Sequence, residues 1–162
     1  MENNNTRILR EDFLKDVLII LRETFEGSPP GQGSAYLDRG IGVLNTLEDL
    51  SAEQVSANFN ETTIAAHSEH LKFYLDRLCE FIEGREESVN WEQSWLIETV
   101  NPQEWETLRA GVKKSYENIL RCIAGVEVWN QNNIGEIIAI IAHTAYHLGA
   151  IRQMIKAFGE ED

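Results

Sequence analysis

Two histidines, His143 and His147, stand four residues apart in the largely apolar stretch IAHTAYHLGAIRQM. On a helix this spacing places both side chains on one face, so both imidazoles can reach the same point beside it. Neutral imidazole is a common ligand of divalent transition metals. The spacing is equally typical of a partly exposed polar pair or of hydrogen-bonded core residues, so on its own it does not predict a metal site.

The chain has two further histidines, His67 and His70, which lie one helical turn apart in TTIAAHSEHLKFYLDRL. All four histidines therefore fall in two clusters, on segments that we expect to pack together. Burying several imidazoles is costly unless each finds a partner, and one divalent ion can bind three of them through nitrogens about 2.0 to 2.1 Å away. The two clusters together favour a metal site shared by two helices.

Four long segments carry apolar residues at helical spacing, and these must position the histidines. They run from Thr6 to about Glu26, from Thr62 or Thr63 to Glu83, from Asn101 to about Ile123, and from Asn133 to Gly159. Two shorter stretches, 41–50 and 51–59, predict brief helical turns. No segment alternates like a strand. The pattern predicts an all-α four-helix bundle with long crossover connections at 27–61 and 84–100.

Helix-start signals support these boundaries. Asn101 suits the N-cap, Pro102 the first helical position, and Glu104 can complete a capping box. Ser51 can cap a turn with Gln54 in the same way.

Length and composition limit the protein class. The 162 residues are enough for one core, so we expect a single domain over 1–162. There are 27 acidic against 14 basic side chains, a formal net charge of -13. A surface of that sign repels phosphate backbones, which argues against nucleic acid as a partner. No uninterrupted apolar run is long enough for a membrane span, and no export signal is visible, so we expect no membrane partner and a cytoplasmic location.

The two cysteines, Cys79 and Cys122, lie inside predicted helices without CxxC spacing. This pattern fits buried, reduced thiols better than a disulfide framework, and it indicates no chemical role for them.

The two histidine segments together resemble the DinB/YfiT-like superfamily, whose members are four-helix bundles with a histidine-ligated metal. The resemblance covers the layout of the whole bundle, and its specific content is a histidine seven residues after a helix-starting Thr and before Leu, plus a distal HxxxH followed by Gly-x-Ile. The matching positions are Thr63, His70, Leu71, His143, His147, Gly149 and Ile151. The resemblance implies that His70, His143 and His147 are the metal ligands.

The choice between His70 and His67 involves a conflict. Helical projection centres His67 on the apolar stripe and puts His70 near its edge, whereas the resemblance assigns the ligand to His70. An edge position is reachable by water and substrate, which suits His70. His67 is then a hydrogen-bonding partner of the site, a substrate contact or a neutral core residue. Tyr74 either packs in the core or aims its hydroxyl at a metal-bound ligand.

Three neutral imidazoles suit Zn(II), Ni(II) or another borderline divalent ion, and they leave a coordination position open, as catalytic sites do. No catalytic residue is identifiable: Glu69 points about 100° away from His70 on a helix, and there is no HExxH. Trp91 and Trp95 either roof a pocket or anchor a loop, and Arg152 has a structural role.

The site and the resemblance favour a metal-dependent enzyme, a transferase or a hydrolase, that acts on a small molecule. The resemblance implies thiol chemistry, including transfer to low-molecular-weight thiols, and a homodimer. The alternative is a noncatalytic metal-binding or stress-associated bundle protein, with the ion held for stability or absent. The residues leave both open.

Overall fold

The computed structural model describes residues 8–159, and this part of the chain is all-helical, as predicted. Seven helical elements follow one another, with no strand among the described residues beyond an isolated bridge between Phe59 and Thr62. The elements are α1 (Arg10–Glu26), α2 (Val43–Glu48), α3 (Ala52–Ser56), α4 (Ile64–Ile82), the 3-10 turn η1 (Trp91–Ser94), α5 (Pro102–Gly125) and α6 (Gln131–Gly159). Thr6, the predicted start of the first helix, lies outside the described residues, but α1 begins later than predicted, at Arg10, because Leu9 is in an extended conformation.

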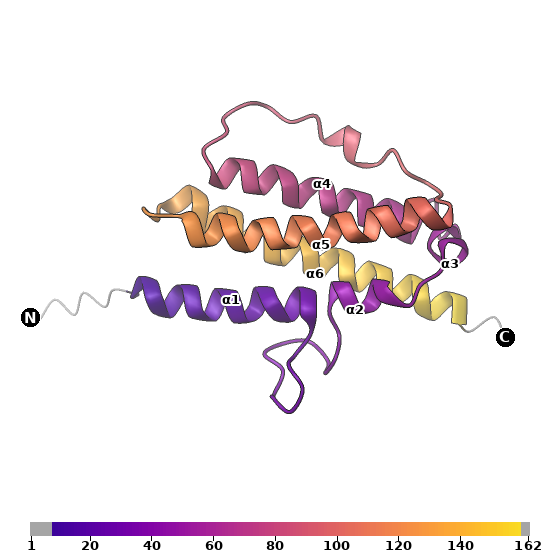
Figure 1. The fold of residues 1–162 in the computed structure, drawn as a ribbon, viewed down its shortest axis with the longest axis horizontal. Coiled ribbons are helices and arrows are strands. Elements are labelled where there is room, and N and C mark those ends of the chain that lie inside the picture. Colours follow the sequence, from indigo (N-terminus) through magenta and orange to yellow (C-terminus); the bar gives the residue numbers. More distant parts are fainter. Residues whose placement is uncertain (1–7, 160–162) are drawn as a thin grey trace, which may run out of the picture.

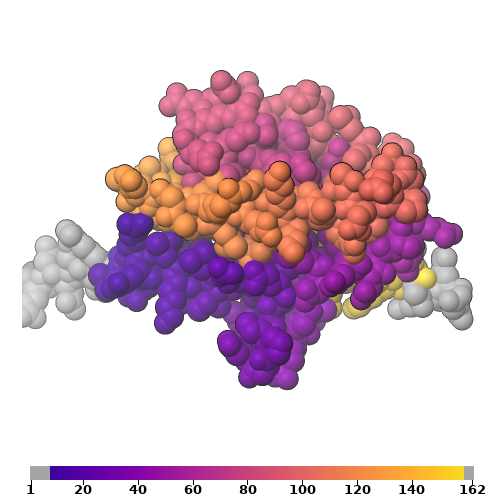
Figure 2. Space-filling model, viewed as in Figure 1, coloured from indigo at the N-terminus to yellow at the C-terminus, as the bar shows by residue number. Residues whose placement is uncertain are grey.

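The four long helices lie side by side in two directions (Figure 1). Helices α1 and α6 run one way, and α4 and α5 run the other way. Residues 84–100 return along the length of α4, so α4 and α5 are parallel neighbours. Helix α4 packs against both α5 and α6, and α1 packs against α6. The connection between α1 and α2 projects from the body of the molecule (Figure 2).

The predicted capping signals are present. In α5, Asn101 accepts from the backbone N–H groups of Gln103 and Glu104, and Glu104 accepts from the backbone of Asn101, with Pro102 at the first position. Ser51 and Gln54 form the same reciprocal box at α3. Each such cap satisfies backbone donors that the first helical turn leaves unpaired.

Helix α6 begins at Gln131, two residues before the predicted start at Asn133. The side chain of Asn130 accepts from the backbone N–H groups of Asn132 and Asn133, while Asn133 accepts from the backbone N–H of Asn130. Asn130 therefore caps α6, ahead of the predicted start at Asn133.

The core fills the space between the long helices. Leu21 of α1, Leu71 and Leu75 of α4, and Ile137 and Ile151 of α6 are fully buried. Burying side chains of this size stabilises the fold by about 1.5 to 3 kcal/mol each relative to leaving them exposed. The core thus fixes α6 against α4, the two helices that carry the histidines.

By length and mean hydropathy alone, Gln131–Phe158 is apolar enough to cross a membrane, with a mean hydropathy of 1.4 in its most apolar 18-residue window. A third of that window is buried inside the molecule (33%). This helix is not an uninterrupted apolar run, because Glu136, His143 and His147 interrupt it. Core helices of soluble proteins pass the same test.

One carboxylate shapes the connection after α1. Glu23 is buried, and its side chain accepts hydrogen bonds from the backbone N–H groups of Ala35, Tyr36 and Leu37 at 2.5, 2.8 and 2.7 Å. Burial by itself raises the pKa of Glu23, but the three backbone donors outweigh it and the pKa is lowered overall. An ionised Glu23 therefore holds this connection in place.

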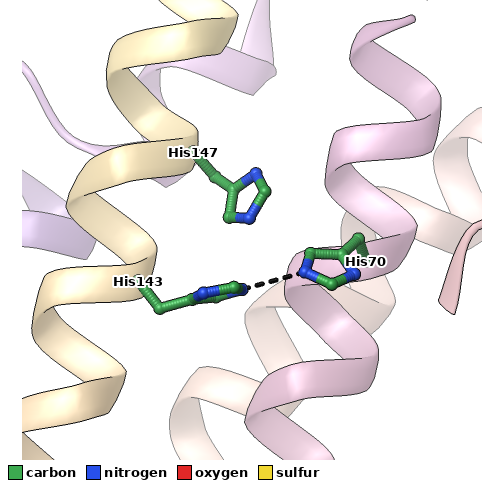
Figure 3. A group of neighbouring side chains, drawn as sticks. All are labelled: His70, His143 and His147. Carbon is green, nitrogen blue, oxygen red and sulfur yellow. Dashed lines mark hydrogen bonds between the residues drawn. The ribbon is translucent and has the colours of Figure 1, made fainter. Parts of the chain in front are cut away.

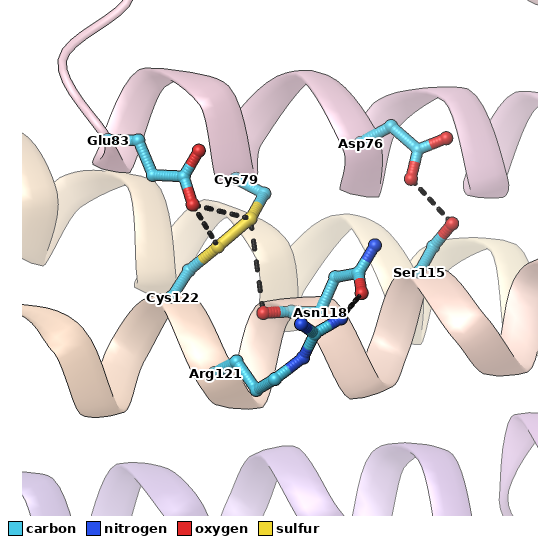
Figure 4. The surroundings of a disulfide bond; sticks show 7 residues. All are labelled: Asp76, Cys79, Glu83, Ser115, Asn118, Arg121 and Cys122. Carbon is cyan, nitrogen blue, oxygen red and sulfur yellow. Dashed lines mark hydrogen bonds between the residues drawn. A yellow bond between two sulfur atoms is a disulfide. The ribbon is translucent and has the colours of Figure 1, made fainter.

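Helices α4 and α5 are joined by a disulfide between Cys79 and Cys122, 43 residues apart in the sequence (Figure 4). The interpretation of these cysteines as reduced thiols was wrong. Their Cα atoms lie 6.1 Å apart, inside the usual range for a disulfide. The pairing depends on α4 and α5 lying parallel in register, which residue spacing along the chain does not reveal.

Candidate metal centre

Three imidazoles converge between α4 and α6 (Figure 3). His70 comes from α4, and His143 and His147 come from successive turns of α6. One ring nitrogen from each of the three lies within 4.8 Å of the others. The Nε2 atoms of His70 and His143 are 3.0 Å apart, close to the separation of about 3.3 Å that two nitrogens adopt on one tetrahedral zinc ion. The structure thus brings together the three residues proposed as ligands.

The ring of His147 has an unsatisfied nitrogen. His147 is 2% exposed, and its Nε2 atom is buried without a hydrogen-bond partner in the protein. Its other nitrogen, Nδ1, lies 2.8 Å from Nδ1 of His67. Whichever tautomer His147 adopts, Nε2 therefore stays unpaired, as a lone pair or as a buried N–H. Such groups are rare in native proteins and call for a partner such as an ion.

Ser94 determines which nitrogen of His70 is free to bind. The Ser94 hydroxyl donates to the backbone carbonyl of Trp91 at 2.6 Å, so its single proton is already used. Ser94 Oγ lies 2.7 Å from His70 Nδ1, so in this second hydrogen bond the imidazole N–H must be the donor and Ser94 Oγ the acceptor. His70 carries its proton on Nδ1, and Nε2 keeps a lone pair that faces His143. A ligand nitrogen with this kind of outer hydrogen bond is the usual arrangement in metal sites.

His67 contacts the group from outside. Its Nδ1 pairs with His147 rather than facing the space between His70 and His143. This is the position of a residue that orients a ligand, one of the three roles left open for it. The opposite arrangement, with His67 as a ligand and His70 outside, does not match the nitrogen positions. Of the two histidines on α4, it is His70 whose ring nitrogen lies close to those of His143 and His147.

Burial keeps the imidazoles neutral. The pKa of His70 is lowered to about 4, mainly by burial and also by the nearby His143 and His67. The pKa of His147 is lowered to about 3, again mainly by burial, with smaller effects of His143, His67 and His70. The pKa values of His67 and His143 are lowered by burial as well. Near neutral pH all four rings are therefore uncharged, which is the form that binds metal.

The crossover between α4 and α5 covers the histidines. The indole of Trp95 stacks on His70, with ring centroids 4.1 Å apart and an interplanar angle of 15°, and meets His67 edge-on at 5.4 Å. Glu69 holds this segment, because its carboxylate accepts from the backbone N–H groups of Leu96 and Ile97 at 2.9 and 2.7 Å. Glu69 thus faces the crossover and not the histidine group, in keeping with its rejection as a catalytic base.

Sequence reasoning missed Ser94 and the role of Glu69. The stretch NWEQSW was identified as a candidate roof because of Trp91 and Trp95, and the serine between them carried no recognisable signal. A short 3-10 turn places it under the roof: Asn90 caps η1, and Ser94 is fully buried.

Two other residues singled out from the sequence have clear positions. The ring of Tyr74 stacks on His143 with centroids 3.7 Å apart and 17° between the planes, so it supports that imidazole by its face. Burial, with a contribution from Glu136, raises the pKa of Tyr74, which keeps its hydroxyl protonated. Arg152 pairs with Asp38 at 3.5 Å, consistent with a structural role.

A pocket of about 690 Å³ opens beside the histidine group. His67 and Trp95 form the part of its lining that contacts His147 and His70. The remaining lining residues come from the connection between α3 and α4, the start of α4, the crossover and α6: Asn58, Glu61, Thr62, Thr63, Ala66, Ile97, Glu98 and Tyr146. A small molecule in this pocket would contact His67, which in turn contacts His147.

Comparisons with known proteins add no identity. No family model, no curated protein and no solved structure matches this chain. The resemblance to the DinB/YfiT-like superfamily therefore rests on the histidine motifs and remains a prediction.

Proposed function

We propose that this protein is a divalent-metal-dependent enzyme acting on a small molecule, with the ion held by His70, His143 and His147. We further propose that its long helices form a four-helix bundle of the DinB-like kind. Zn(II) and Ni(II) fit the all-imidazole ligand set. His67 orients His147, and Ser94 orients His70.

The observation that carries the proposal is the buried, unpaired Nε2 atom of His147 beside the paired nitrogens of His70 and His143. A buried polar atom without a partner costs about 1 to 3 kcal/mol. A cation at this point would accept a lone pair from each ring and remove that cost. Because the imidazoles are neutral, they would not repel the ion.

Catalysis is favoured over a purely structural site by coordination and access. Three protein ligands leave room for a fourth, which is the arrangement of catalytic zinc sites, whereas structural sites are usually closed by four protein ligands. The pocket beside His67 gives a small molecule a route to the group. Bound metal would supply Lewis acidity, favouring the thiolate form of a substrate thiol.

A thiol-dependent S-transferase is the reaction class that we propose. The chain would contribute positioning: the aromatic surfaces of Trp95 and Tyr146 line the pocket, and His67 lies between the pocket and His147. The proposed acceptor is a small electrophile and the donor a low-molecular-weight thiol.

One observation favours the alternative, a noncatalytic metal-binding protein. Among the described residues, no carboxylate belongs to the group of close ligand atoms around the three histidines, so no general base is in place there. Thiol transfer does not require such a base when the thiol is already ionised.

The test begins with metal content. Protein purified without an affinity tag is given Zn(II), Ni(II) and Mn(II) in turn, and bound metal is measured. We expect one equivalent of bound metal per chain, and we expect His143→Ala to lose it. If the protein binds much less than one equivalent of every ion, both the metal-dependent enzyme and the noncatalytic metal-binding protein are rejected. Turnover of an electrophilic acceptor is then followed with several low-molecular-weight thiols. Metal-dependent turnover supports the enzyme, and a loaded protein that turns over none of them supports the noncatalytic alternative.

A further inference from the structure

A second group of ligand atoms lies on the other side of α4. The Sγ atoms of Cys79 and Cys122 and a carboxylate oxygen of Glu83 all lie within 4.8 Å of one another. Cys79 and Glu83 are one turn apart on α4, and Cys122 faces them from α5 (Figure 4). Cys79 is nine residues after His70 on the same helix, about 14 Å farther along its axis. This group is therefore separate from the histidines.

We propose that Cys79 and Cys122 form a redox-controlled metal site: once their disulfide is reduced, the two thiolates and Glu83 bind a soft divalent ion such as Zn(II). The proposal does not depend on the function proposed for the histidine group.

The position of Glu83 supports a role in the reduced protein. Its Oε1 atom lies 3.4 Å from Sγ of Cys122 and 4.0 Å from Sγ of Cys79. The sulfurs of a disulfide carry no proton, so in the oxidised protein they offer this carboxylate no hydrogen bond. Reduced thiols can donate to it, and thiolates can share a cation with it. The Glu83 carboxylate thus faces two sulfurs that can form a hydrogen bond or share a cation with it only after the disulfide is reduced.

The distances suit a common ion. In a tetrahedral zinc site with bonds of about 2.3 Å to sulfur and about 2.0 to 2.2 Å to carboxylate oxygen, neighbouring ligand atoms lie roughly 3.5 Å apart. The separation of 3.4 Å between Cys122 and Glu83 already matches. The Cα atoms of Cys79 and Cys122 are 6.1 Å apart. Once the covalent bond is broken, rotation of the two side chains can therefore move the sulfurs apart without displacing the helices. Two thiolates and one carboxylate select zinc-like ions over magnesium or calcium.

The sulfurs are accessible to a reductant. Both cysteines line an open surface pocket of about 410 Å³ between α4 and α5. Cys79 is partly exposed, whereas Cys122 is 8% exposed. The other lining residues are charged or polar: Asp76, Arg77, Glu80, Glu83, Asn118 and Arg121. A small thiol can approach Cys79 from this pocket.

The chemistry balances with a thiol reductant, RSH. Two RSH molecules supply two electrons and two protons, the bond between Cys79 and Cys122 breaks, and RSSR leaves while both cysteines become thiols. Binding of the ion then releases the two thiol protons to solvent. A reducing compartment favours the metal-binding dithiol, and an oxidising one favours the disulfide.

The test uses Co(II) as a spectroscopic probe of the full chain. Protein is reduced with an excess of dithiothreitol, desalted without oxygen and titrated beside untreated protein. We expect the reduced protein to bind one more equivalent of Co(II) than the oxidised protein, with a sulfur-to-cobalt charge-transfer band that Zn(II) removes. Histidine-bound Co(II) gives no such band, so failure of this proposal is distinguishable from failure of the histidine site.

Variants identify the ligands. Cys79→Ser and Cys122→Ser should each abolish the band, and Glu83→Gln should weaken Co(II) binding about tenfold or more. Glu80→Gln removes the same charge from the same pocket but is not in the ligand group, so it should have a smaller effect than Glu83→Gln. Far-UV circular dichroism should show the same helical content before and after reduction. A folded, reduced protein without the band, equal effects of the two glutamine variants, or unfolding on reduction would each overturn the proposal.

Discussion

The Nδ1 atoms of His67 and His147 lie 2.8 Å apart, although the two residues are separated by 80 positions in the sequence. This contact orients the imidazole of His147, so that its Nε2 atom is buried beside His70 and His143. It also distinguishes His67, which contacts His147 from outside the group, from the three histidines whose nitrogens converge.

The four histidines should therefore differ in their effect on metal affinity. We expect His70→Ala, His143→Ala and His147→Ala each to lower the affinity for Zn(II) or Ni(II) by more than about 100-fold, and His67→Ala to lower it by about 10 to 100-fold, as is usual for residues that hydrogen-bond to a ligand. Competition with a chromophoric chelator measures this ranking. A larger loss in His67→Ala than in His70→Ala would show that the ligand was assigned to the wrong residue of α4.

Ser94→Ala should lower metal affinity about tenfold while leaving the three ligands in place. The substitution removes the acceptor that keeps the proton of His70 on Nδ1, so Nε2 is no longer held as the free nitrogen. Ser88→Ala, at an exposed position of the same crossover, is the matched control. The same chelator competition applies, and equal affinities for the two variants would contradict the assigned role of Ser94.

Glu69→Gln should loosen the crossover over the histidines. It weakens two charge-assisted hydrogen bonds to Leu96 and Ile97, and we expect the free energy of unfolding to fall by about 1 to 3 kcal/mol. Urea unfolding measures the loss, and acrylamide quenching of tryptophan fluorescence should rise as Trp95 becomes more accessible. The control is Glu92→Gln, an exposed glutamate in the same segment. If quenching rises equally in both variants, Glu69 does not hold the crossover over the histidines.

The stability contributed by Glu23 should depend on pH. Its folded-state pKa lies below the ordinary value of a glutamate, so the unfolded chain takes up the proton first as the pH falls. The contribution is then fully present above the unfolded pKa and is lost as the pH falls through the folded one. At pH 7 we expect Glu23→Gln to be less stable than the parent by about 1 to 3 kcal/mol, and the difference to shrink below about pH 4.5.

Urea unfolding between pH 3 and pH 7 measures this dependence. Glu117→Gln, at an exposed position of α5, serves as the control. A stability difference for Glu23→Gln that stays constant over the whole range would contradict the assigned role of the charge.

Much of the helical fold was predictable because its signals are local. The caps at Asn101 and Ser51 and the apolar faces of α4 and α5 depend on residues a few positions apart, and the structure agrees with them. The start of α6 was misplaced by two residues because Asn130 and Asn133 are both good caps, and only the backbone geometry chooses between them.

The outer parts of the candidate site depend on contacts between distant segments and were less predictable. His70 contacts Ser94 only because the crossover folds back over α4, and no residue pattern encodes that path. The disulfide was missed for a related reason, since Cys79 and Cys122 meet across two helices whose relative direction is set by the same crossover. Helical periodicity determines which face a residue occupies but not which distant face lies opposite.

The antiparallel packing of α4 against α6 also has a consequence for biosynthesis. A chain growing from its N-terminus presents His67 and His70 long before His143 and His147 are made, because more than 70 residues separate the partners. Contacts this distant in sequence form late in folding. A nascent polypeptide therefore cannot bring the three imidazoles together until α6 has been translated, and an ion of the kind proposed would be bound only after synthesis of that last helix.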